Sequence, residues 1–473
     1  MKSQLVVIGG GPGGYAAAFM AADLGMEVTV VDLEPRLGGV CLLRGCIPSK
    51  ALLHVAKAVN DARHLDDWGV RLGKPKFDID AMRARKQKVI DTLTGGLKQI
   101  AAKRKVRVVQ ARAVFENSGT LRLEPVGNGK LDDDRLQFDH CILATGSRPM
   151  SVPGLELPGS DRLIDSTGAL ELRDVPESLL VVGGGYIGLE MGTVYATLGS
   201  RVSVVEMTDG LLPGADRDLV RPLHKRLESQ FEAIYLNTKV VGLGDKKKAV
   251  EVTFEGNLEE KAQQFSRVLV SVGRRPNSDR LNLENTQVEI DERGFVVVDH
   301  QQRTADPRIL AIGDVAGQPM LAHKATHEGK VAAEVLAGEA AVFEPRAIPA
   351  VVFTDPEIAW AGLTETEAKE QGRKVEVARF PWAASGRAQA VEATDGLTKW
   401  LIDPETERLL GCGIVGSGAG ELIAEAVVAI EMGGEARDLT ESIHPHPTLS
   451  ETLSAAAEVY FGTATDLHRP RRR

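Results

Sequence analysis

Cysteine is scarce in this chain, whose 473 residues include only four, at positions 41, 46, 141 and 412. So low a content excludes a disulfide-rich secreted scaffold. The four cysteines form no C-x2-C pair, so they lack the usual spacing of a zinc site, and we expect no metal. Two of them nevertheless lie five residues apart, in CLLRGCIPSK (residues 41–50). This pair could be a structural clip, half of a metal site or a working redox pair.

Excess positive charge and long apolar runs are also lacking. Asp and Glu number 66 against 57 Lys and Arg, a net charge of −9, so we expect no nucleic-acid partner. No stretch of ~18 uninterrupted apolar residues occurs, so we expect no transmembrane helix and no membrane partner. The first 25 residues have a lysine before an apolar run, as a signal peptide does, but glycines break the run. We therefore expect a soluble, cytoplasmic protein.

Glycine, by contrast, is abundant, with 49 residues, and it is concentrated in a repeated motif. Residues 5–32 and 179–206 each contain an apolar strand, G-x-G-x-x-G, a helix rich in small residues and a second β-rich run that ends in an acid. Each position of the second copy is shifted by 174 residues. The glycines and terminal acids are Gly9, Gly11, Gly14 and Asp32 in the first copy, and Gly183, Gly185, Gly188 and Glu206 in the second.

This spacing is typical of dinucleotide-binding βαβ units. The first glycine allows a tight turn, the second lets a pyrophosphate approach the backbone, and the third lets the helix pack on the sheet. The helix N-terminus attracts the pyrophosphate, and the acid accepts hydrogen bonds from ribose hydroxyls. Glu206 would repel a 2′-phosphate, so the second site should prefer NAD to NADP. The alternative, close-packed βαβ units that bind no nucleotide, is weakened by the presence of two copies.

The remaining segments predict an α/β protein with a final α+β domain. Residues 140–149 and 267–277 resemble each other, so the repeat extends to a returning strand in each unit, and residues 106–125 predict a β-meander. Residues 308–317 are an apolar strand that ends at Asp314, where ligands bind in α/β sheets. The last ~125 residues mix β runs and helices, which is typical of a separate α+β domain.

Several motifs, in this order along nearly the whole chain, resemble those of the pyridine nucleotide–disulfide oxidoreductases, and above all of the members that oxidise dihydrolipoamide. They are GGGPGGYAAA, GGVCLLRGCIPSKALLH, ATGSRP, GGGYIGLE, VGRRPN, AIGDV, MLAHKATHEG, VVFTDPEIAWAG and HPHPTLSE. The resemblance implies two Rossmann-like domains and a C-terminal α+β dimerisation domain. The implied divisions are an FAD-binding domain (1–148), an NAD-binding domain (149–272), a central segment returning to the FAD domain (273–346) and an interface domain (347–473).

The resemblance also implies that Cys41 and Cys46 form a redox-active disulfide. The first cysteine of the motif exchanges with substrate sulfur and the second lies against the flavin. Pro48 suits the first turn of a helix, so Cys46 should lie at a helix N-terminus, where a thiolate is stabilised. A persistent structural bridge is disfavoured in a cytosolic enzyme. Cys141 and Cys412 lie in apolar β contexts, and we expect them to be core residues.

Two further pairs of side chains follow from the resemblance. Lys50 should lie near the flavin and pair with Glu190, although two solvated helix charges are the alternative. His446 should be the acid–base group with Glu451 as its carboxylate partner, and this pair should reach the active site of the other subunit of a homodimer. His444 is expected to be structural.

The implied cofactors are FAD and NAD, and their expected contacts lie in the same motifs. For FAD, beyond the first fingerprint and Lys50, these are Gly39, Ala113, Thr145, Gly146, Ser147, Asp314, Met320, Leu321, Ala322 and His323. For NAD, beyond the second fingerprint and Glu190, they are Tyr186, a candidate gate, and Val240 and Gly273.

The implied activity is oxidation of protein-bound dihydrolipoamide with reduction of NAD, and the implied partners are lipoyl domains of acyltransferases or of a glycine-cleavage carrier. The alternatives are another disulfide reductase of the same family and a non-catalytic FAD-binding subunit. Glu206 argues against an NADPH-dependent reductase, and the C-terminus lacks the extra cysteine pair of mercuric reductases.

Two features stay open at this point. Arg44 lies between the two cysteines in sequence. Pointing at the sulfurs, its charge would favour a thiolate by about 1 kcal/mol or more, whereas pointing at solvent it would do little. The final RPRRR is either a solvated tail or a partner-binding segment.

Overall fold

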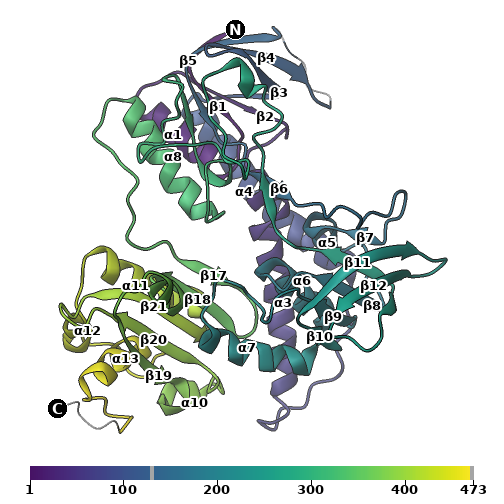
Figure 1. Ribbon diagram of the computed structural model, residues 1–473, viewed down its shortest axis with the longest axis vertical. Helices are drawn as coiled ribbons and strands as arrows, with labels where there is room; N and C mark the ends of the chain where they lie inside the picture. Colours follow the sequence, from purple (N-terminus) through teal and green to yellow (C-terminus); the bar gives the residue numbers. More distant parts are fainter. Residues whose placement is uncertain (128–130, 132, 469–473) are drawn as a thin grey trace.

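The computed structural model describes residues 1–127, 131 and 133–468, so the RPRRR tail lies outside the described residues. The chain forms three lobes, each built on its own sheet (Figure 1). The first lobe holds the N-terminus and the third holds the C-terminal helix.

The first lobe has a six-stranded sheet with β1 (Lys2–Ile8) near its centre. This strand pairs in parallel with β2 (Val28–Asp32) and β5 (Arg135–Leu143), so nearly every residue of its second half is buried. Helices α1 (Pro12–Asp23) and α8 (Ala322–Leu336) pack against each other beside this sheet. The remaining strands are β3 (Arg107–Asn117), β4 (Thr120–Pro125) and β16 (Ile309–Ala311). The predicted meander is confirmed by the antiparallel pairing of β3, β4 and β5.

The second lobe repeats this arrangement. Strand β8 (Ser178–Val182) pairs in parallel with β9 (Arg201–Val205) on one side and β14 (Arg267–Val270) on the other. Helix α6 (Tyr186–Leu198) follows β8 as α1 follows β1. The sequence repeat is therefore a structural repeat, including the predicted returning strand. The other elements are α5 (Ser166–Glu171), α7 (Arg217–Gln230), β7 (Leu163–Ile164), β10 (Ala233–Tyr235), β11 (Thr238–Asp245), β12 (Val250–Gly256) and β13 (Ala262–Phe265).

The third lobe is the predicted α+β unit. Its five-stranded sheet has the order β17-β18-β21-β20-β19, and every pairing in it is antiparallel. The strands are β17 (Ala350–Val352), β18 (Glu357–Gly362), β19 (Glu376–Pro381), β20 (Leu397–Ile402) and β21 (Leu409–Gly416). The helices are α9 (Glu365–Glu370), α10 (Gly386–Ala390), α11 (Ala419–Glu431), α12 (Ala436–Glu441) and α13 (Glu451–Phe461).

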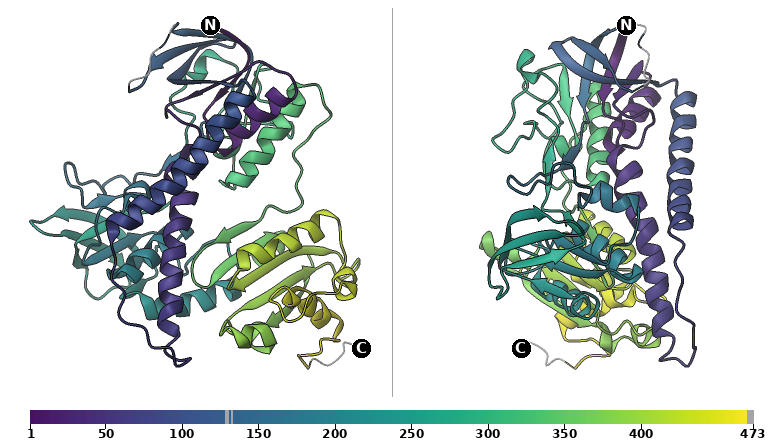
Figure 2. Two further views of the ribbon diagram at one scale, coloured as in Figure 1. Left: turned by 180° about the vertical axis from the view of Figure 1, so that it is seen from behind. Right: turned by 90° about the vertical axis from the view of Figure 1, so that its right-hand side faces the viewer.

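Two connections join the first and second lobes. The chain leaves the first lobe through β6 (Ser147–Pro149) and returns through β15 (Arg274–Pro276), and these strands pair in antiparallel fashion. Beside them, α3 (Cys46–His64) and α4 (Ile79–Lys103) pack together and run along the outside of both lobes (Figure 2). The start of α3 therefore lies between the lobes.

Helix α2 (Gly39–Arg44) continues almost directly into α3. In length and composition, the stretch Gly39–His64 is apolar enough to cross a membrane. This stretch carries the cysteine pair and Lys50, and α3 packs on α6 of the second lobe. We therefore interpret it as an interlobe helix of the folded protein.

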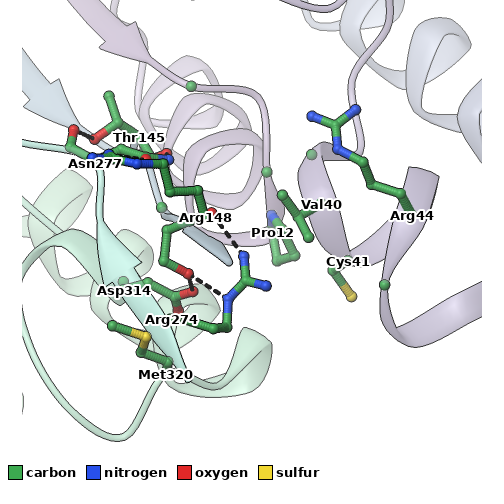
Figure 3. A pocket seen from close by; sticks show the side chains of 18 of the residues that line it. Pro12, Val40, Cys41, Arg44, Thr145, Arg148, Arg274, Asn277, Asp314 and Met320 are labelled. Atoms are coloured by element: carbon green, nitrogen blue, oxygen red, sulfur yellow. Dashed lines mark hydrogen bonds between the residues drawn. The ribbon is translucent and has the colours of Figure 1, made fainter. Parts of the chain in front are cut away.

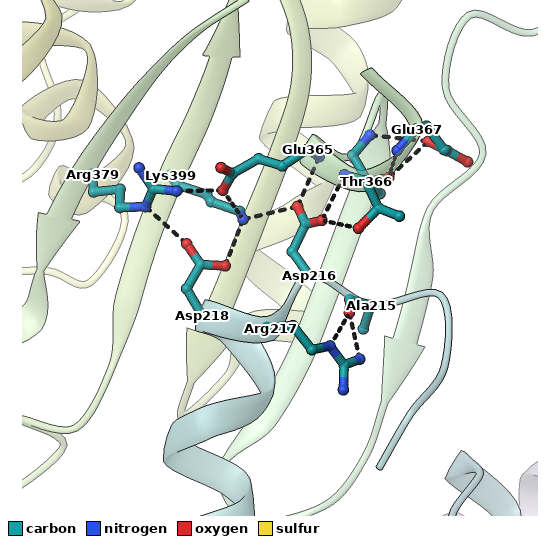
Figure 4. Close-up of polar contacts among 10 residues, drawn as sticks. Ala215, Asp216, Arg217, Asp218, Glu365, Thr366, Glu367, Arg379 and Lys399 are labelled. Atoms are coloured by element: carbon teal, nitrogen blue, oxygen red, sulfur yellow. Dashed lines mark hydrogen bonds and ion pairs between the residues drawn. The ribbon is translucent and has the colours of Figure 1, made fainter. Parts of the chain in front are cut away.

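A buried ion network joins the second and third lobes (Figure 4). The ammonium of Lys399 on β20 lies 2.8 Å from Asp216, 2.6 Å from Asp218 and 2.6 Å from Glu365, and its side chain is only 1% exposed. Both aspartates belong to the start of α7, whereas Glu365 begins α9. Arg379 also contacts Asp218 (2.8 Å) and Glu365. Three carboxylates that could hold a cation thus surround a lysine.

The titration of this network follows from its geometry. Burial alone would raise the pKa of Asp216 and Asp218, yet the Lys399 ammonium holds both below their ordinary 3.8. Burial likewise opposes the charge of Lys399, but the carboxylates, Asp218 above all, raise the pKa of Lys399 above 10.5. The depressed carboxyl pKa values add stability above pH ~4 that is lost as the pH falls. The raised lysine pKa adds stability below pH ~10.5 that is lost as the pH rises.

We expect Lys399→Met to lower the free energy of unfolding by about 3–5 kcal/mol near neutral pH, because the carboxylates lose their buried counter-charge. The difference from the parent should narrow below pH ~4, where the carboxylates become protonated. Urea unfolding at several pH values measures this. The control is Lys369→Met, which removes an exposed lysine of α9. Equal urea midpoints of unfolding for the two variants near neutral pH would contradict the expectation.

Candidate active site

A cavity lies where the first and second lobes meet, and the first predicted fingerprint and the start of α6 border it. The predicted residues that do not line it include Gly14, Gly183, Gly185, Gly188 and Glu206. It is lined by Gly9, Gly11 and Asp32 from the first fingerprint, and by Tyr186 and Glu190 from α6. Other predicted residues in its lining are Gly39, Cys41, Cys46, Lys50, Ala113, Thr145, Gly146, Ser147, Asp314, Met320 and Ala322. Figure 3 shows the part of this cavity around Pro12, Cys41 and Asp314.

The two fingerprint loops have the same local geometry. Gly9 and Gly183 have φ values of 107° and 105°, a conformation that favours glycine. A Cβ on the third glycine would lie 1.8 Å from the Gly9 carbonyl oxygen in the first loop, and 2.6 Å from that of Gly183 in the second. The middle glycines differ, because a Cβ on Gly185 would meet nothing within 4 Å, and one on Gly11 would meet only the Gly39 Cα at 3.8 Å, an ordinary contact distance. This is the pattern expected of loops that admit a phosphate group beside the backbone.

The acid of each repeat also fastens its own loop. The Asp32 carboxylate accepts a hydrogen bond from the Gly10 N–H, and that of Glu206 accepts one from the Gly184 N–H at 2.7 Å. The other carboxylate oxygen accepts a hydrogen bond from the N–H two residues further along the chain. The donor is Glu34 for Asp32 (2.7 Å) and Thr208 for Glu206 (2.8 Å). Burial raises the pKa of Asp32. Sequence analysis foresaw only the contact with ribose.

The wall opposite α1 is built by side chains from β15 and the segment after it. Arg274 donates to the Ser147 hydroxyl (2.7 Å), which donates to Asp314 (2.5 Å) (Figure 3). Asn277 and Thr145 exchange hydrogen bonds of 2.9 Å. The sequence prediction missed Arg274 and Asn277, although both lie in VGRRPN, the motif that resembles ATGSRP.

Some predicted cofactor contacts are absent from the lining of this cavity. Leu321 and His323 are not among its residues, and the His323 Nε2 lies 2.8 Å from the Pro349 carbonyl oxygen. Val240 is buried in the core of the second lobe, and Gly273 has open space where a Cβ would lie. Their roles as cofactor contacts remain predictions.

The cysteine pair lies at the junction of α2 and α3. Cys41 is partly buried in α2, whereas Cys46 is exposed and is the first residue of α3, as predicted. A hydrogen bond from Cys41 and the charge of Lys50 outweigh the partial desolvation of the Cys46 sulfur and lower the pKa of Cys46 to about 7. The same hydrogen bond, together with burial, raises the pKa of Cys41. The position of Cys46 at the start of α3 and the charge of Lys50 favour Cys46 as the thiolate of the reduced pair. Cys141 and Cys412 are buried, as expected.

The predicted ion pair forms at the base of the cavity. The Lys50 ammonium lies 3.1 and 3.0 Å from the two oxygens of Glu190, whose side chain is only 3% exposed. One of these oxygens also accepts the Phe353 N–H at 3.0 Å, and the ammonium lies 4.4 Å from the centre of the Phe353 ring. One carboxylate therefore contacts all three lobes. The interpretation of two solvated helix charges is wrong.

The predicted acid–base pair forms in the third lobe, away from the cavity. His446 Nδ1 lies 2.9 Å from Glu451, which also accepts the Thr448 N–H at 2.7 Å. The Thr448 N–H and His446 outweigh burial and lower the pKa of Glu451. The imidazole is 79% exposed, and neither residue lines the cavity of its own chain. His444 instead bonds Glu425 of α11 at 2.7 Å, which fits the structural role expected of it.

The comparisons with known proteins agree with this arrangement. Residues 3–329 match the family described as "Pyridine nucleotide-disulphide oxidoreductase", and residues 348–457 match its dimerisation domain. The chain belongs to the pyridine nucleotide–disulphide oxidoreductase family. This family uses FAD and NAD, and the dimerisation domain supports a homodimer.

Curated relatives cover nearly the full length. The chain is 50% identical to "Dihydrolipoyl dehydrogenase" from Vibrio cholerae over 469 residues, which cover 99% of this chain and 97% of the relative. It is 43% identical to the protein of that name from Geobacillus stearothermophilus over 463 residues, covering 98% and 97%. Among solved structures, LpdA from Mycobacterium tuberculosis has a TM-score of 0.87 at 26% identity, covering 96% and 99%. The HOCl-induced flavoprotein disulfide reductase RclA from Escherichia coli has a TM-score of 0.85 at 28% identity. The match covers 97% of this chain and 99% of RclA.

The residues on the cavity fit FAD as the family requires. Gly11 lines the cavity without a side chain, as a residue beside a pyrophosphate is expected to do, and Asp32 lies where the adenosine ribose of a bound dinucleotide is expected. The flavin end is then expected near Cys46, Lys50 and Asp314. In the second lobe, Gly185 and Glu206 hold the corresponding positions for NAD. Tyr186, the first residue of α6, lines the cavity, and desolvation of its hydroxyl raises the pKa of Tyr186 to about 12.

We expect Lys50→Met to raise the pKa of the Cys46 thiol by roughly one unit, because the nearest positive charge is removed. The rate of alkylation by iodoacetamide, measured against pH on the dithiothreitol-reduced holoenzyme, reports this pKa. Lys57→Met is the control, since this lysine of α3 pairs with Asp61 (2.9 Å) and does not line the cavity. The expectation fails if both variants titrate like the parent.

Proposed function

We propose that this chain is a dihydrolipoyl dehydrogenase that oxidises protein-bound dihydrolipoamide and reduces NAD through the Cys41–Cys46 pair and FAD. The observation that carries the proposal is the position of the cysteine pair on the cavity lining at the start of α3, with the Lys50–Glu190 ion pair on the same lining. The relatives called dihydrolipoyl dehydrogenase align with this chain over 97% of their own length.

The chain's own residues account for the sulfur chemistry. With Cys41 and Cys46 oxidised to a disulfide, His446 accepts a proton from one substrate thiol. The substrate thiolate attacks Cys41, a mixed disulfide forms, and Cys46 leaves as the thiolate that its low pKa favours. His446 gives the first proton to the departing Cys41 sulfur and accepts that of the second substrate thiol, which attacks the substrate sulfur of the mixed disulfide. Oxidised lipoamide leaves, and Cys41 is released as a thiol.

The remaining residues position charge and cofactors. Bound FAD would supply the two-electron chemistry that links the dithiol pair to NAD. Lys50, held by Glu190, puts a positive charge beside Cys46, and Asp314 borders the same end of the cavity. Glu451 keeps the His446 ring oriented and stabilises its protonated form.

We propose the same domain divisions as the sequence suggests: 1–148 for FAD, 149–272 for NAD, 273–346 as the returning segment and 347–473 as the interface. The partners we propose are the lipoyl domains of 2-oxo acid dehydrogenase or glycine-cleavage complexes. The cellular location we propose is the cytoplasm. The exposed His446 and its absence from the cavity support an active site completed by the second subunit.

The Cys46→Ser variant tests the activity. We expect the parent to reduce NAD, and NADP far less, with dihydrolipoamide, and the variant to lose at least about 1000-fold in kcat while it keeps its FAD, because serine cannot form the disulfide. Flavin absorbance and NADH production measure both. Cys412→Ala, which changes a core cysteine, should keep the activity.

Equal inactivity of the parent and both variants would favour a non-catalytic flavoprotein. A preference for NADP would favour another reductase of the family and would contradict the role of Glu206. Activity with a disulfide other than lipoamide, and none with lipoamide, would also overturn the proposal.

A mixed dimer tests the shared active site. In a heterodimer of a Cys46→Ser subunit and a His446→Gln subunit, one site has both changes and the other has neither if His446 acts across the interface. Such a dimer, isolated with two different affinity tags, should have about half the parent kcat. If His446 acted within its own subunit, each site would carry one change and the heterodimer would be inactive.

A further inference from the structure

The direction of the Arg44 side chain cannot be read from the sequence. It is the last residue of α2, two residues before Cys46, so its guanidinium could face the sulfurs. In the structure it points away from Cys41 and the Cys41 sulfur points to the other side (Figure 3). Its Nη1 pairs instead with the carboxylate of Glu34. The positive charge beside the cysteines comes from Lys50.

The Arg44–Glu34 pair lies at the end of the cavity that holds the first fingerprint. Glu34 donates its N–H to Asp32, the acid of that fingerprint, at 2.7 Å. The charge of Arg44 reaches the same carboxylate and favours its ionised form, although burial dominates and raises the pKa of Asp32. Both Arg44 and Glu34 line the cavity, and both are about one-third exposed, at 38% and 32%.

The backbone holds Arg44 at a fixed place relative to the phosphate loop. Gly39, the first residue of α2, has φ +57°, and a Cβ there would lie 2.5 Å from the Gly11 Cα. The start of α2 is thus packed directly on the glycine that admits a pyrophosphate. Arg44 follows five residues later, about 7.5 Å along the helix axis. Among the described residues, Glu34 is its one ion-pair partner, through Nη1, so the remaining N–H donors are available to a ligand in the cavity that Arg44 lines.

From this geometry we infer that Arg44 is a binding residue for the ADP half of FAD, held in place by Glu34, and that it does not adjust the redox cysteines. An ADP moiety carries two phosphate charges, and a guanidinium is the side chain best suited to phosphate oxygens. The inference rests on the proposed function only in taking FAD as the ligand. It predicts that Arg44 slows FAD release and leaves the thiolate pKa unchanged.

FAD release from the purified holoenzyme tests this. After dilution into buffer of low and of moderate salt, free flavin is separated by ultrafiltration over time and measured by absorbance. Arg44→Gln should release FAD about tenfold faster than the parent, since one charge-assisted contact is lost. Added salt should speed release from the parent more than from the variant.

The chain offers a matched control in Arg36→Gln. Arg36 is 40% exposed and pairs with Asp91 at 2.7 Å, but it does not line the cavity. This variant should release FAD at the parent rate. Arg44→Lys keeps the charge and should lie between the parent and Arg44→Gln, which separates loss of contact from misfolding.

Two outcomes would overturn the inference. One is equal FAD release from the parent, Arg44→Gln and Arg36→Gln. The other is unchanged release together with a raised thiolate pKa in Arg44→Gln, measured by iodoacetamide alkylation, which would assign Arg44 to the sulfurs. A parent protein that purifies without flavin would instead refute the proposed function, so the two failures are distinguishable.

Discussion

The arrangement of the active site depends on one buried carboxylate. Glu190, on α6 of the second lobe, contacts Lys50 of the first lobe and the Phe353 N–H of the third. A carboxylate that is 3% exposed must be paired, because an unpaired buried charge costs several kcal/mol. The lobes are therefore held where the ammonium and the N–H can both reach it. This same constraint places Lys50 beside Cys46, so the demands of packing and of thiolate chemistry coincide.

In both fingerprints, the acid at the end of the second strand holds the glycine loop in place. In each, a carboxylate at the end of the second strand accepts the N–H of the glycine at the centre of the loop. The acid thus fixes the loop before any ribose is present. The lobes differ in what surrounds the loops: the first borders the cysteines and the wall of Arg274 and Asn277, whereas the second has Tyr186 at its mouth.

Sequence analysis predicted the repeat from its spacing, and it predicted the redox cysteines, the Lys50–Glu190 pair and the His446–Glu451 pair from motifs that resemble those of a known family. It did not predict that Arg274 braces Ser147, since 127 residues separate them and no periodicity links them. The Lys399 network was missed for the same reason: it joins α7 to β20 across 181 residues. The direction of Arg44 stayed open because it depends on Glu34, which lies across a loop, and not on the cysteines next to it in sequence.

The Lys399 network has a consequence for the solution behaviour of the protein. Asp216, Asp218 and Glu365 have oxygens close enough together to capture a divalent cation, yet a lysine ammonium lies among them. This counter-ion is part of the chain, so neither dilution nor dialysis nor a chelator can remove it. The contact between the second and third lobes at this point therefore needs no bound metal ion, unlike that of proteins whose lobes are joined by calcium.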